Sequence, residues 1–422
     1  MLIERTEYIE RLKSFRDKDI IKVVTGLRRS GKSTLFELYI NYLKSTGVNE
    51  KDIIWINFDN PIYEFETAKE LYDYVINQTR TGAKKTYVFL DEVQMVPEFQ
   101  KAVNGLRQDN KYDVYITGSN AYLLSGELAT LLSGRYVEIH MLPLSFREYL
   151  RGLYPGTLDF ETMRHKINVR EALMDYLNYG GLPQSLEFYE RRDSIMLPDA
   201  NSIHEYMENI LGTIVYKDIM QRHGITDRGL LERVLKFILD NIGQPISTKR
   251  IVDVLNGNQI KTSFYTVENY VRALEECFLI YRVDRYDIRG RELLTTGYKY
   301  FVADTGLRNY LLGRSADDDI GQLLENVVYF ELLRRRCQIR VGKYDNLEVD
   351  FVVNDDGETK YYQVSKDVSI VETFEREISP LRNIKDNYDK YLIVLEDGIA
   401  GDLNGIKLEN VTKWLVDEWI KA

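Results

Sequence analysis

Eight consecutive residues, Gly26-Leu27-Arg28-Arg29-Ser30-Gly31-Lys32-Ser33, match the pattern G-x-x-x-x-G-K-[ST] in full. They follow a short apolar run and open a segment with helical character, Thr34 to Leu43. Glycines let backbone N–H groups converge on phosphate oxygens, and the start of a helix adds its positive dipole end. The pattern therefore predicts a phosphate-binding loop in which Lys32 reaches the β- and γ-phosphates and the Ser33 hydroxyl binds Mg²⁺.

We expect ATP and Mg²⁺ as ligands, with ATP contacted from this loop and the first helical turn by Gly26, Arg28, Arg29, Ser30, Gly31, Lys32, Ser33 and Thr34. Arg28 and Arg29 add either phosphate contacts or interface contacts, and their spacing does not decide between the two.

Paired carboxylates end an apolar run about sixty residues later, in Tyr87-Val88-Phe89-Leu90-Asp91-Glu92. After a phosphate-binding loop, this pair predicts that Asp91 holds Mg²⁺ through water and that Glu92 orients or deprotonates the attacking water. Asp-Glu is otherwise common at a solvated strand end. The next strand, Val114 to Thr117, runs into Gly118-Ser119-Asn120, where Asn120 either senses the γ-phosphate or belongs to a plain turn.

The elements that must position these residues alternate between strand and helix. Strands are expected at Ile20–Thr25, Ile53–Phe58, Tyr87–Leu90, Val114–Thr117 and Tyr136–Met141. Such alternation predicts an α/β fold, with a parallel sheet covered by helices on both faces.

These motifs together resemble the AAA+-superfamily ATPases of bacteria and archaea, P-loop proteins of the signal-transducing type that carry a winged-helix and nuclease-like C-terminal half. The resemblance rests on GLRRSGKST at 26–34, FLDEVQ at 89–94, TGSN at 117–120, LLSGRYVEI at 131–139, LPLSFREYL at 142–150 and YGGLP at 179–183. It implies four domains: an ATPase core at 1–155, a helical lid at 156–224, a winged helix-turn-helix at 225–292 and a restriction-endonuclease-like domain at 293–422.

The resemblance also implies two further roles near the nucleotide. Arg135 lies where such proteins place an arginine finger, which brings positive charge to the γ-phosphate, usually from a neighbouring subunit. The alternative is a surface arginine near a strand start. Pro183 looks like the lid proline that packs on adenine, whereas Gly-Gly-Leu-Pro alone would only be a turn.

The third expected domain has a small net positive charge, which favours contact with DNA only slightly. Residues 225–292 contain 11 Lys or Arg and 10 Asp or Glu, net +1, against −10 for the chain. Helices are expected at 230–239, 247–255 and 267–278, with Ser247 or Thr248 as one N-cap and Thr266 as another. The third would be a recognition helix for double-stranded DNA, although winged helices also bind proteins.

The C-terminal domain resembles a nuclease that has lost part of its site. Glu325 lies on an amphipathic helix, and Asp350 lies in Leu347–Val353, where alternation places it opposite Leu347, Val349 and Phe351. A nuclease site needs a Glu and a Lys on the next strand, and the matching residues here are Gln363 and Ser365. We therefore expect a degenerate site at Glu325, Asp350 and Gln363, which a lysine from elsewhere in the chain would restore.

The composition indicates in which cellular compartment we expect this protein. Of the 422 residues, two are cysteines, Cys277 and Cys337, without metal or disulfide spacing, as is typical of a reducing compartment. The charged N-terminus and the absence of an 18-residue apolar run favour a cytoplasmic protein without a membrane partner.

Three functions are compatible with these observations: an ATP-driven switch or motor that associates with DNA, an ATP-gated metal-dependent DNA nuclease, and an ATP-binding scaffold for a protein partner with negligible turnover. A finger at Arg135 would require a homo-oligomer. The Gln363 and Ser365 substitutions disfavour the nuclease, and Glu92 disfavours the scaffold.

Overall fold

The computed structural model describes residues 2–121, 134–156, 165, 167–192, 195–396 and 401–417. Residues 131–133 of the LLSGRYVEI motif and most of 157–166 in the expected lid lie outside these ranges. The chain forms two compact units, one from Met1–Pro143 with Glu276–Phe278 and the other from the remaining residues. The four domain bounds expected from the sequence stay a prediction.

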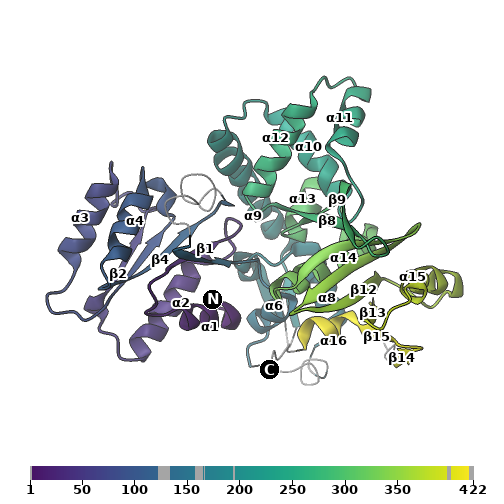
Figure 1. Cartoon of the computed structure of the whole chain (residues 1–422), viewed down its shortest axis with the longest axis horizontal. Coiled ribbons are helices and arrows are strands. Elements are labelled where there is room, and N and C mark those ends of the chain that lie inside the picture. Colours follow the sequence, from purple (N-terminus) through teal and green to yellow (C-terminus); the bar gives the residue numbers. More distant parts are fainter. Residues whose placement is uncertain are drawn as a thin grey trace. The chain divides into compact units, whose positions relative to one another are not determined.

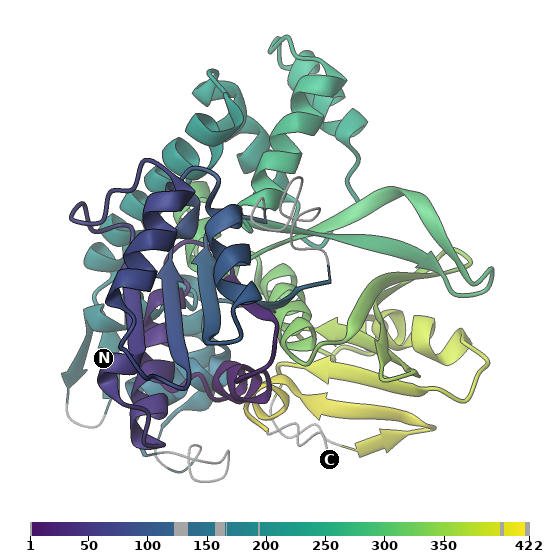
Figure 2. The same cartoon turned by 60° about the vertical axis from the view of Figure 1, so that its left-hand side comes forward.

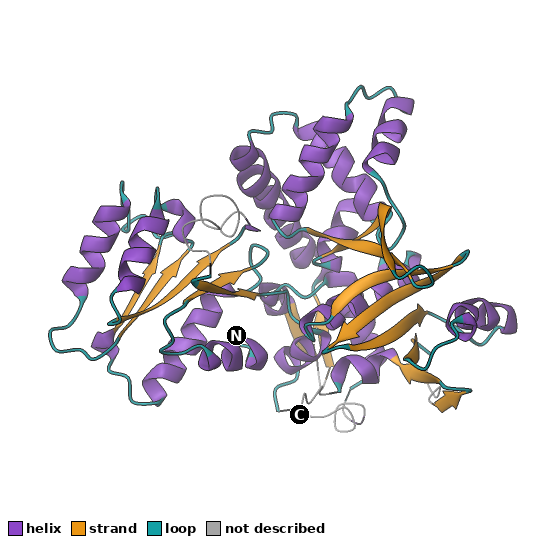
Figure 3. Cartoon of the chain, in the orientation of Figure 1, coloured by secondary structure: helices purple, strands orange, loops and turns teal. Residues whose placement is uncertain are grey.

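The first unit contains a five-stranded parallel sheet in the order β2-β3-β4-β1-β5. Its strands are β1 (Ile21–Thr25), β2 (Ile53–Asn57), β3 (Thr86–Asp91), β4 (Tyr112–Gly118) and β5 (Tyr136–His140). Its helices are α1 (Thr6–Ser14), α2 (Lys32–Ser45), α3 (Ala68–Gln78) and α4 (Phe99–Gln108). The expected α/β fold and all five expected strands are confirmed (Figures 1 and 3).

Helices cover both faces of this sheet, as expected. One apolar cluster joins α1 and α2 to the sheet through Leu12, Phe36 and Phe89. The other joins α3 and α4 through Leu71, Val103 and further apolar side chains. Strands β1, β3 and β4 are buried along their whole length and are largely apolar, and the buried Lys22 of β1 forms an ion pair with Asp113 of β4.

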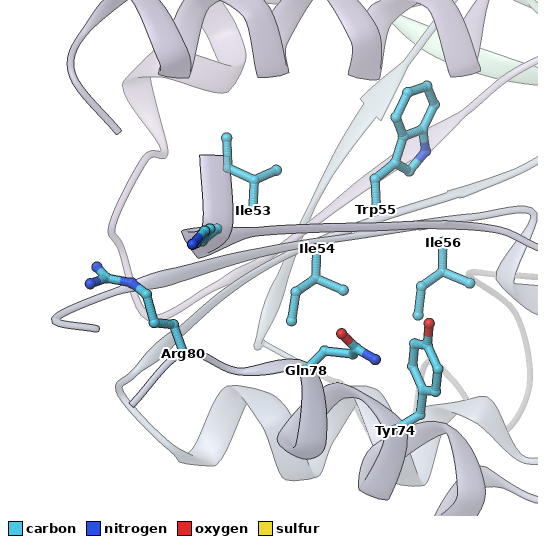
Figure 4. A pocket seen from close by; sticks show the side chains of 8 residues that line it. Ile53, Ile54, Trp55, Ile56, Tyr74, Gln78 and Arg80 are labelled. Carbon is cyan, nitrogen blue, oxygen red and sulfur yellow. The ribbon is translucent and has the colours of Figure 1, made fainter. Parts of the chain in front are cut away.

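Strand β2 forms one edge of this sheet, and a pocket of about 390 Å³ lies along it (Figure 4). Ile53 and Trp55 point to one side of the strand, whereas Ile54 and Ile56 point to the other, toward Tyr74. Trp55 stays 40% exposed, so this edge is partly apolar.

The second unit begins with helices and a short hairpin. Its helices up to residue 276 are α6 (Phe146–Leu153), α8 (Val169–Tyr179), α9 (Ala200–Thr213), α10 (Arg228–Asp240), α11 (Thr248–Gly257) and α12 (Phe264–Glu276). The antiparallel pair β6 (Tyr189–Arg192) and β7 (Ile195–Pro198) interrupts a region that the sequence pattern assigned to helices alone. The hydroxyl of Ser247 caps α11 as expected. The cap expected at Thr266 is wrong, because α12 begins at Phe264 and Ser263 Oγ accepts the Thr266 N–H.

An eight-stranded mixed sheet dominates the rest of this unit, in the order β14-β15-β13-β12-β11-β10-β8-β9. Its strands are β8 (Ile280–Asp287), β9 (Glu292–Val302), β10 (Gln338–Tyr344), β11 (Leu347–Asp355), β12 (Glu358–Ser365), β13 (Asp389–Val394), β14 (Gly401–Leu403) and β15 (Ile406–Asn410). The remaining helices are α13 (Thr305–Leu312), α14 (Ile320–Arg334), α15 (Val371–Asn383) and α16 (Val411–Val416). Figure 2 shows how the long β8–β9 hairpin continues this sheet at one edge.

Helices α14 and α15 both pack on this sheet. Tyr329 of α14 stacks on Phe301 and lies near Phe351, and α15 packs Ile378 and Leu381 into another apolar cluster. Strand β11 carries a bulge, because Arg340 pairs with Val352 whereas Gly342 pairs with Val349. No helix in the described ranges is long and apolar enough to cross a membrane.

Candidate nucleotide-binding site and carboxylate cluster

The phosphate-binding loop joins the end of β1 to the start of α2. Gly26 has a φ of +144°, and a Cβ at this residue would lie 2.1 Å from the carbonyl oxygen of Met141. Gly31, with a φ of +100°, is the N-cap of α2. Gly26 therefore has both a conformational and a packing reason to be glycine, and Gly31 has a conformational one, because its φ lies in a region that favours glycine.

Lys32 is the first residue of α2, and its side chain is buried against the loop. Its Nζ donates to the carbonyl oxygens of Gly26 at 3.1 Å and Leu27 at 3.2 Å. The same nitrogen lies 3.8 Å from Glu92 Oε1. The structure thus brings Lys32 and Glu92, two of the residues that the sequence analysis singled out, close together.

Arg5 also holds this loop, and sequence analysis missed it. Its guanidinium is buried and donates from Nη1 to Ser30 O at 3.2 Å and from Nη2 to Leu142 O at 2.7 Å. Arg5 therefore ties the loop to the residue that follows Met141. No local pattern around Arg5 marks this role, because both of its partners are distant in sequence.

Asp91 is the last residue of β3 and is fully buried. Its Oδ1 accepts a hydrogen bond of 2.5 Å from Thr117 Oγ1 on β4. Burial raises the pKa of Asp91, while Thr117 and the nearby Ser33 hydroxyl lower it. Its Oδ2 has no hydrogen-bond partner within the described part of the chain.

Glu92 follows Asp91 in the left-handed region, with a φ of 57°. Its backbone N–H donates to Thr117 Oγ1 at 2.8 Å, and its Oε2 accepts from Gln94 Nε2 at 2.5 Å. Burial raises the pKa of the Glu92 carboxyl, but Lys32 and Gln94 outweigh it and the pKa falls below its usual value. Glu92 is therefore an anion at neutral pH.

The other predicted residues of this unit are placed as follows. Asn120 is buried two residues beyond β4, next to Ser119, whose hydroxyl helps to lower the pKa of Glu92. Arg28 is half-buried and adds to the positive charge that acts on Glu92. Arg29, with a φ of 64°, and Arg135 are exposed, and Thr34 is half-buried in the first turn of α2.

Pro183 belongs to the second unit, where its motif has a packing role. A Cβ on Gly180 would lie 2.2 Å from Asp304 Oδ1, and the Gly181 N–H donates to Asp304 Oδ2 at 2.7 Å. Asp304 also caps α13 through the Leu307 N–H. The two glycines thus allow the end of α8 to pack closely against the buried carboxylate of Asp304. A contact between Pro183 and adenine stays a prediction.

Two family models match this chain. Residues 18–150 match an AAA domain, and residues 170–318 match a domain of unknown function. An uncharacterized protein of Haemophilus influenzae is 37% identical over 418 residues, which cover 98% of this chain and 99% of that protein. An uncharacterized protein of Methanocaldococcus jannaschii is 30% identical over 341 residues, 79% of this chain and 72% of that one.

The chain belongs to the same family as these two relatives, and its first part is an AAA P-loop ATPase domain. Among solved structures, it is similar to a Walker-type ATPase of Pyrococcus abyssi, with 15% identity, a TM-score of 0.49 and coverage of 73% of this chain and 95% of that one. The Aeropyrum pernix Orc1 protein in complex with DNA has 16% identity, a TM-score of 0.33 and coverage of 75% and 93%.

The AAA domain offers suitable ligands for Mg²⁺. A hard divalent cation prefers carboxylate and hydroxyl oxygens and keeps several waters. Ser33 lies beside the Asp91 carboxyl group, and the buried Asp91 Oδ2 lacks a protein donor within the described residues. The Ser33 hydroxyl and the Asp91 carboxylate are therefore suitable ligands for the Mg²⁺ of a bound Mg-ATP.

The second unit brings Glu325, Asp350 and Gln363 into one buried cluster, as predicted. The Asp350 N–H donates to Gln363 Oε1 at 3.3 Å, and the Val364 N–H donates to Asp350 Oδ2 at 2.8 Å. The bulge in β11 breaks the expected alternation. Val349 packs with the α15 cluster, whereas Phe351 contacts Phe301 and Tyr329, so these two side chains do not share a face.

Lys299 of β9 lies in the middle of this cluster, which sequence analysis did not foresee. Its Nζ lies 2.8 Å from Glu325 Oε1, 2.8 Å from Glu348 Oε1 and 4.0 Å from Asp350 Oδ1. Burial lowers the pKa of Lys299, but Glu325, Asp350 and Glu348 outweigh it and raise the pKa above its usual value. Burial raises the pKa of Glu325 and of Asp350.

Replacement of Thr117 by Val should destabilise the AAA domain. The Glu92 N–H and Asp91 Oδ1 would lose their common partner, and unsatisfied buried polar groups cost about 1–3 kcal/mol. Urea unfolding of Thr117→Val and Thr117→Ser measures this, because serine keeps the hydroxyl. Equal stability of the two variants would show that the hydroxyl is unimportant.

Replacement of Lys299 by Met should destabilise the second unit in a pH-dependent way. The raised pKa of Lys299 stabilises the fold below its unfolded pKa and stops doing so only as pH rises through the folded value. The raised pKa values of Glu325 and Asp350 mean that their ionisation opposes folding, and this opposition grows without Lys299. We expect a loss of about 3–5 kcal/mol at pH 8 that shrinks toward pH 4 as the carboxylates protonate.

The control is Lys407→Met, which removes an ammonium that is 43% exposed and 2.9 Å from Asp389. This change should cost about 1 kcal/mol or less. The free energy of unfolding of both variants and the wild type is measured by denaturant titration between pH 4 and 8. A loss of stability in Lys299→Met that does not vary with pH would contradict this account.

Proposed function

We propose that this protein binds and hydrolyses Mg-ATP and acts as an AAA+-type nucleotide-driven switch or motor. The observation that carries the proposal is the convergence of Lys32, Asp91 and Glu92 at the ends of β1 and β3, where Thr117 binds the Asp91 carboxylate and the Glu92 backbone N–H. The AAA-domain match over residues 18–150 supports it.

Each residue has a role that follows from its surroundings. Lys32 supplies positive charge for the β- and γ-phosphates, and Ser33 and Asp91 would hold Mg²⁺, which neutralises charge on the phosphate oxygens when bound. Glu92 is an anion with a lowered pKa and accepts a proton from, or orients, the attacking water. Asn120, buried beside Ser119, is proposed to sense the γ-phosphate.

The remaining roles follow from the family resemblance. We propose that residues 156–224 form a lid whose Pro183 contacts adenine, and that residues 225–292 form a winged helix that binds double-stranded DNA. The exposed Tyr265 and Phe264 at the start of α12, and the order α10, α11, α12 followed by the β8–β9 hairpin, support the second idea. ATP binding would then reorient these modules.

We infer that the cluster around Lys299 is an internal ion network rather than a nuclease centre. A lysine from another strand is present, as a restored nuclease would require, but its ammonium lies at hydrogen-bond distance from two carboxylates. One of them, Glu325, belongs to the expected nuclease site, and the same ammonium lies 4.0 Å from Asp350, so both acidic residues that would bind a metal already face an internal cation. No group of three or more His, Cys, Asp or Glu within the described residues is arranged to hold a metal ion.

Glu92→Gln should abolish ATP turnover and leave ATP binding intact. The amide keeps the size of the side chain but cannot accept the water proton, so we expect a loss of about 10²–10⁴-fold in kcat. Steady-state hydrolysis with Mg²⁺ and binding of a fluorescent ATP analogue measure the two properties. Unchanged turnover in the variant would refute the role of Glu92.

The same assay, repeated with double-stranded DNA, tests the proposed DNA contact. Two results together support the winged helix as a DNA-binding domain: DNA raises the turnover of the wild type, and Glu92→Gln abolishes that turnover. Turnover that DNA leaves unchanged would count against it and would favour a protein partner.

Arg135→Ala should lower turnover by about 10³-fold or more if Arg135 acts as a finger on a neighbouring copy. Specific activity of the wild type should then fall on dilution, because the neighbour is lost. Lys69→Ala on α3 is a matched removal of an exposed cation and should have no effect. Activity that neither dilution nor Arg135→Ala changes would exclude a finger in trans.

A further inference from the structure

A hollow of about 380 Å³ lies on the eight-stranded sheet, away from the Lys299 cluster residues. It is lined by side chains from β8, β10, β11 and β12, from the turn between β8 and β9, and from the segment before β13. The residues that matter for its chemistry are Tyr286, Arg291, Arg340, Tyr361, Asp386 and Tyr388. Its volume is at the lower end of the range for small-ligand sites.

Aromatic rings form much of this hollow. Tyr388 is 48% exposed, and its ring centroid lies 6.2 Å from that of the buried Tyr361. Tyr286 is half-buried on β8 and carries the guanidinium of Arg340 over its ring, with 5.2 Å from Cζ to the centroid. An exposed tyrosine ring offers a planar surface on which another flat ring can stack, and a guanidinium over a neighbouring ring adds a cation beside it.

The charge of the hollow favours an anion. Arg340 and the exposed Arg291 form no ion pair with a carboxylate within the described residues, so their charges are available to a ligand. Asp386 is the acidic group among the lining residues, and it is already engaged: it accepts from Tyr361 OH at 2.7 Å and lies 3.4 Å from Lys390 Nζ.

We propose that this hollow binds one nucleotide of a single-stranded nucleic acid. The base would stack on the exposed Tyr388, and Arg340 and Arg291 would contact the adjoining phosphates. Single strands fit this chemistry because their bases expose both faces, whereas the faces of bases in a duplex are covered by their neighbours. The proposal is independent of the proposed ATP hydrolysis, since all of these residues belong to the second unit.

The test is binding of a ten-residue oligodeoxythymidine with a 3′ fluorescent label to the full chain, followed by anisotropy at low salt. Excess MgADP is present throughout, so that the phosphate-binding loop is occupied in the same way in every measurement. We expect Tyr388→Ala, Arg340→Ala and Arg291→Ala each to weaken binding by about tenfold, because a stacked base or a phosphate contact is lost. Tyr388→Phe should bind like the wild type, because it keeps the ring.

Arg289→Ala is the matched control for charge. Arg289 lies in the same turn as Arg291 and is exposed, but it is paired with Asp345 at 2.8 Å and does not line the hollow. Its loss should change the dissociation constant by less than about twofold.

The proposal would be overturned by no binding of the oligonucleotide by the wild type, by equal loss in Arg289→Ala and Arg291→Ala, or by binding of Tyr388→Ala as tight as that of the wild type. Binding of the matching duplex that is equally sensitive to Tyr388→Ala would also overturn it, because a stacked duplex hides its base faces. Circular dichroism melts of each variant separate these outcomes from a loss of fold.

Discussion

One hydroxyl group holds the two carboxylates of the first unit in their places. Thr117 Oγ1 donates to Asp91 and accepts from the backbone of Glu92, so a single atom on β4 fixes the end of β3. Glu92 takes a left-handed backbone conformation directly after the strand, which needs such support. The parallel pairing of β3 with β4 is what brings this hydroxyl within reach. The positions of Asp91 and Glu92 therefore depend on a side chain of the neighbouring strand.

The two units place a buried lysine among carboxylates in opposite ways. Lys32 is held by two backbone carbonyl groups and lies 3.8 Å from Glu92. Lys299 lies 2.8 Å from each of two carboxylates, so its charge is already neutralised where it stands. The first arrangement suits the recognition of an incoming anion, whereas the second fixes the packing of β9 against α14 and β11.

The sequence predicted what depends on local patterns. The glycine loop, the apolar strands and the Asp91–Glu92 pair are visible because each signal lies within a few consecutive residues. The roles of Arg5, Thr117 and Lys299 were not visible, because their partners lie far away in the chain and the residues themselves belong to no motif. The alternation argument for Phe351 was wrong because a bulge, which has no sequence signature here, inserts one residue into β11.

The order of strands in the first sheet has a consequence for synthesis of the chain. Strand β1 leaves the ribosome early, but its two neighbours are β4 and β5, made from residues 112–118 and 136–140. The carbonyl group of Met141 that packs on Gly26 arrives later still. Until residues 112–118 have been made, the apolar β1 has no partner on either side, and closing such long loops is slow. Nascent chains shorter than this are thus expected to need protection from aggregation, and the phosphate-binding loop takes shape only after the last strand of its sheet has been translated.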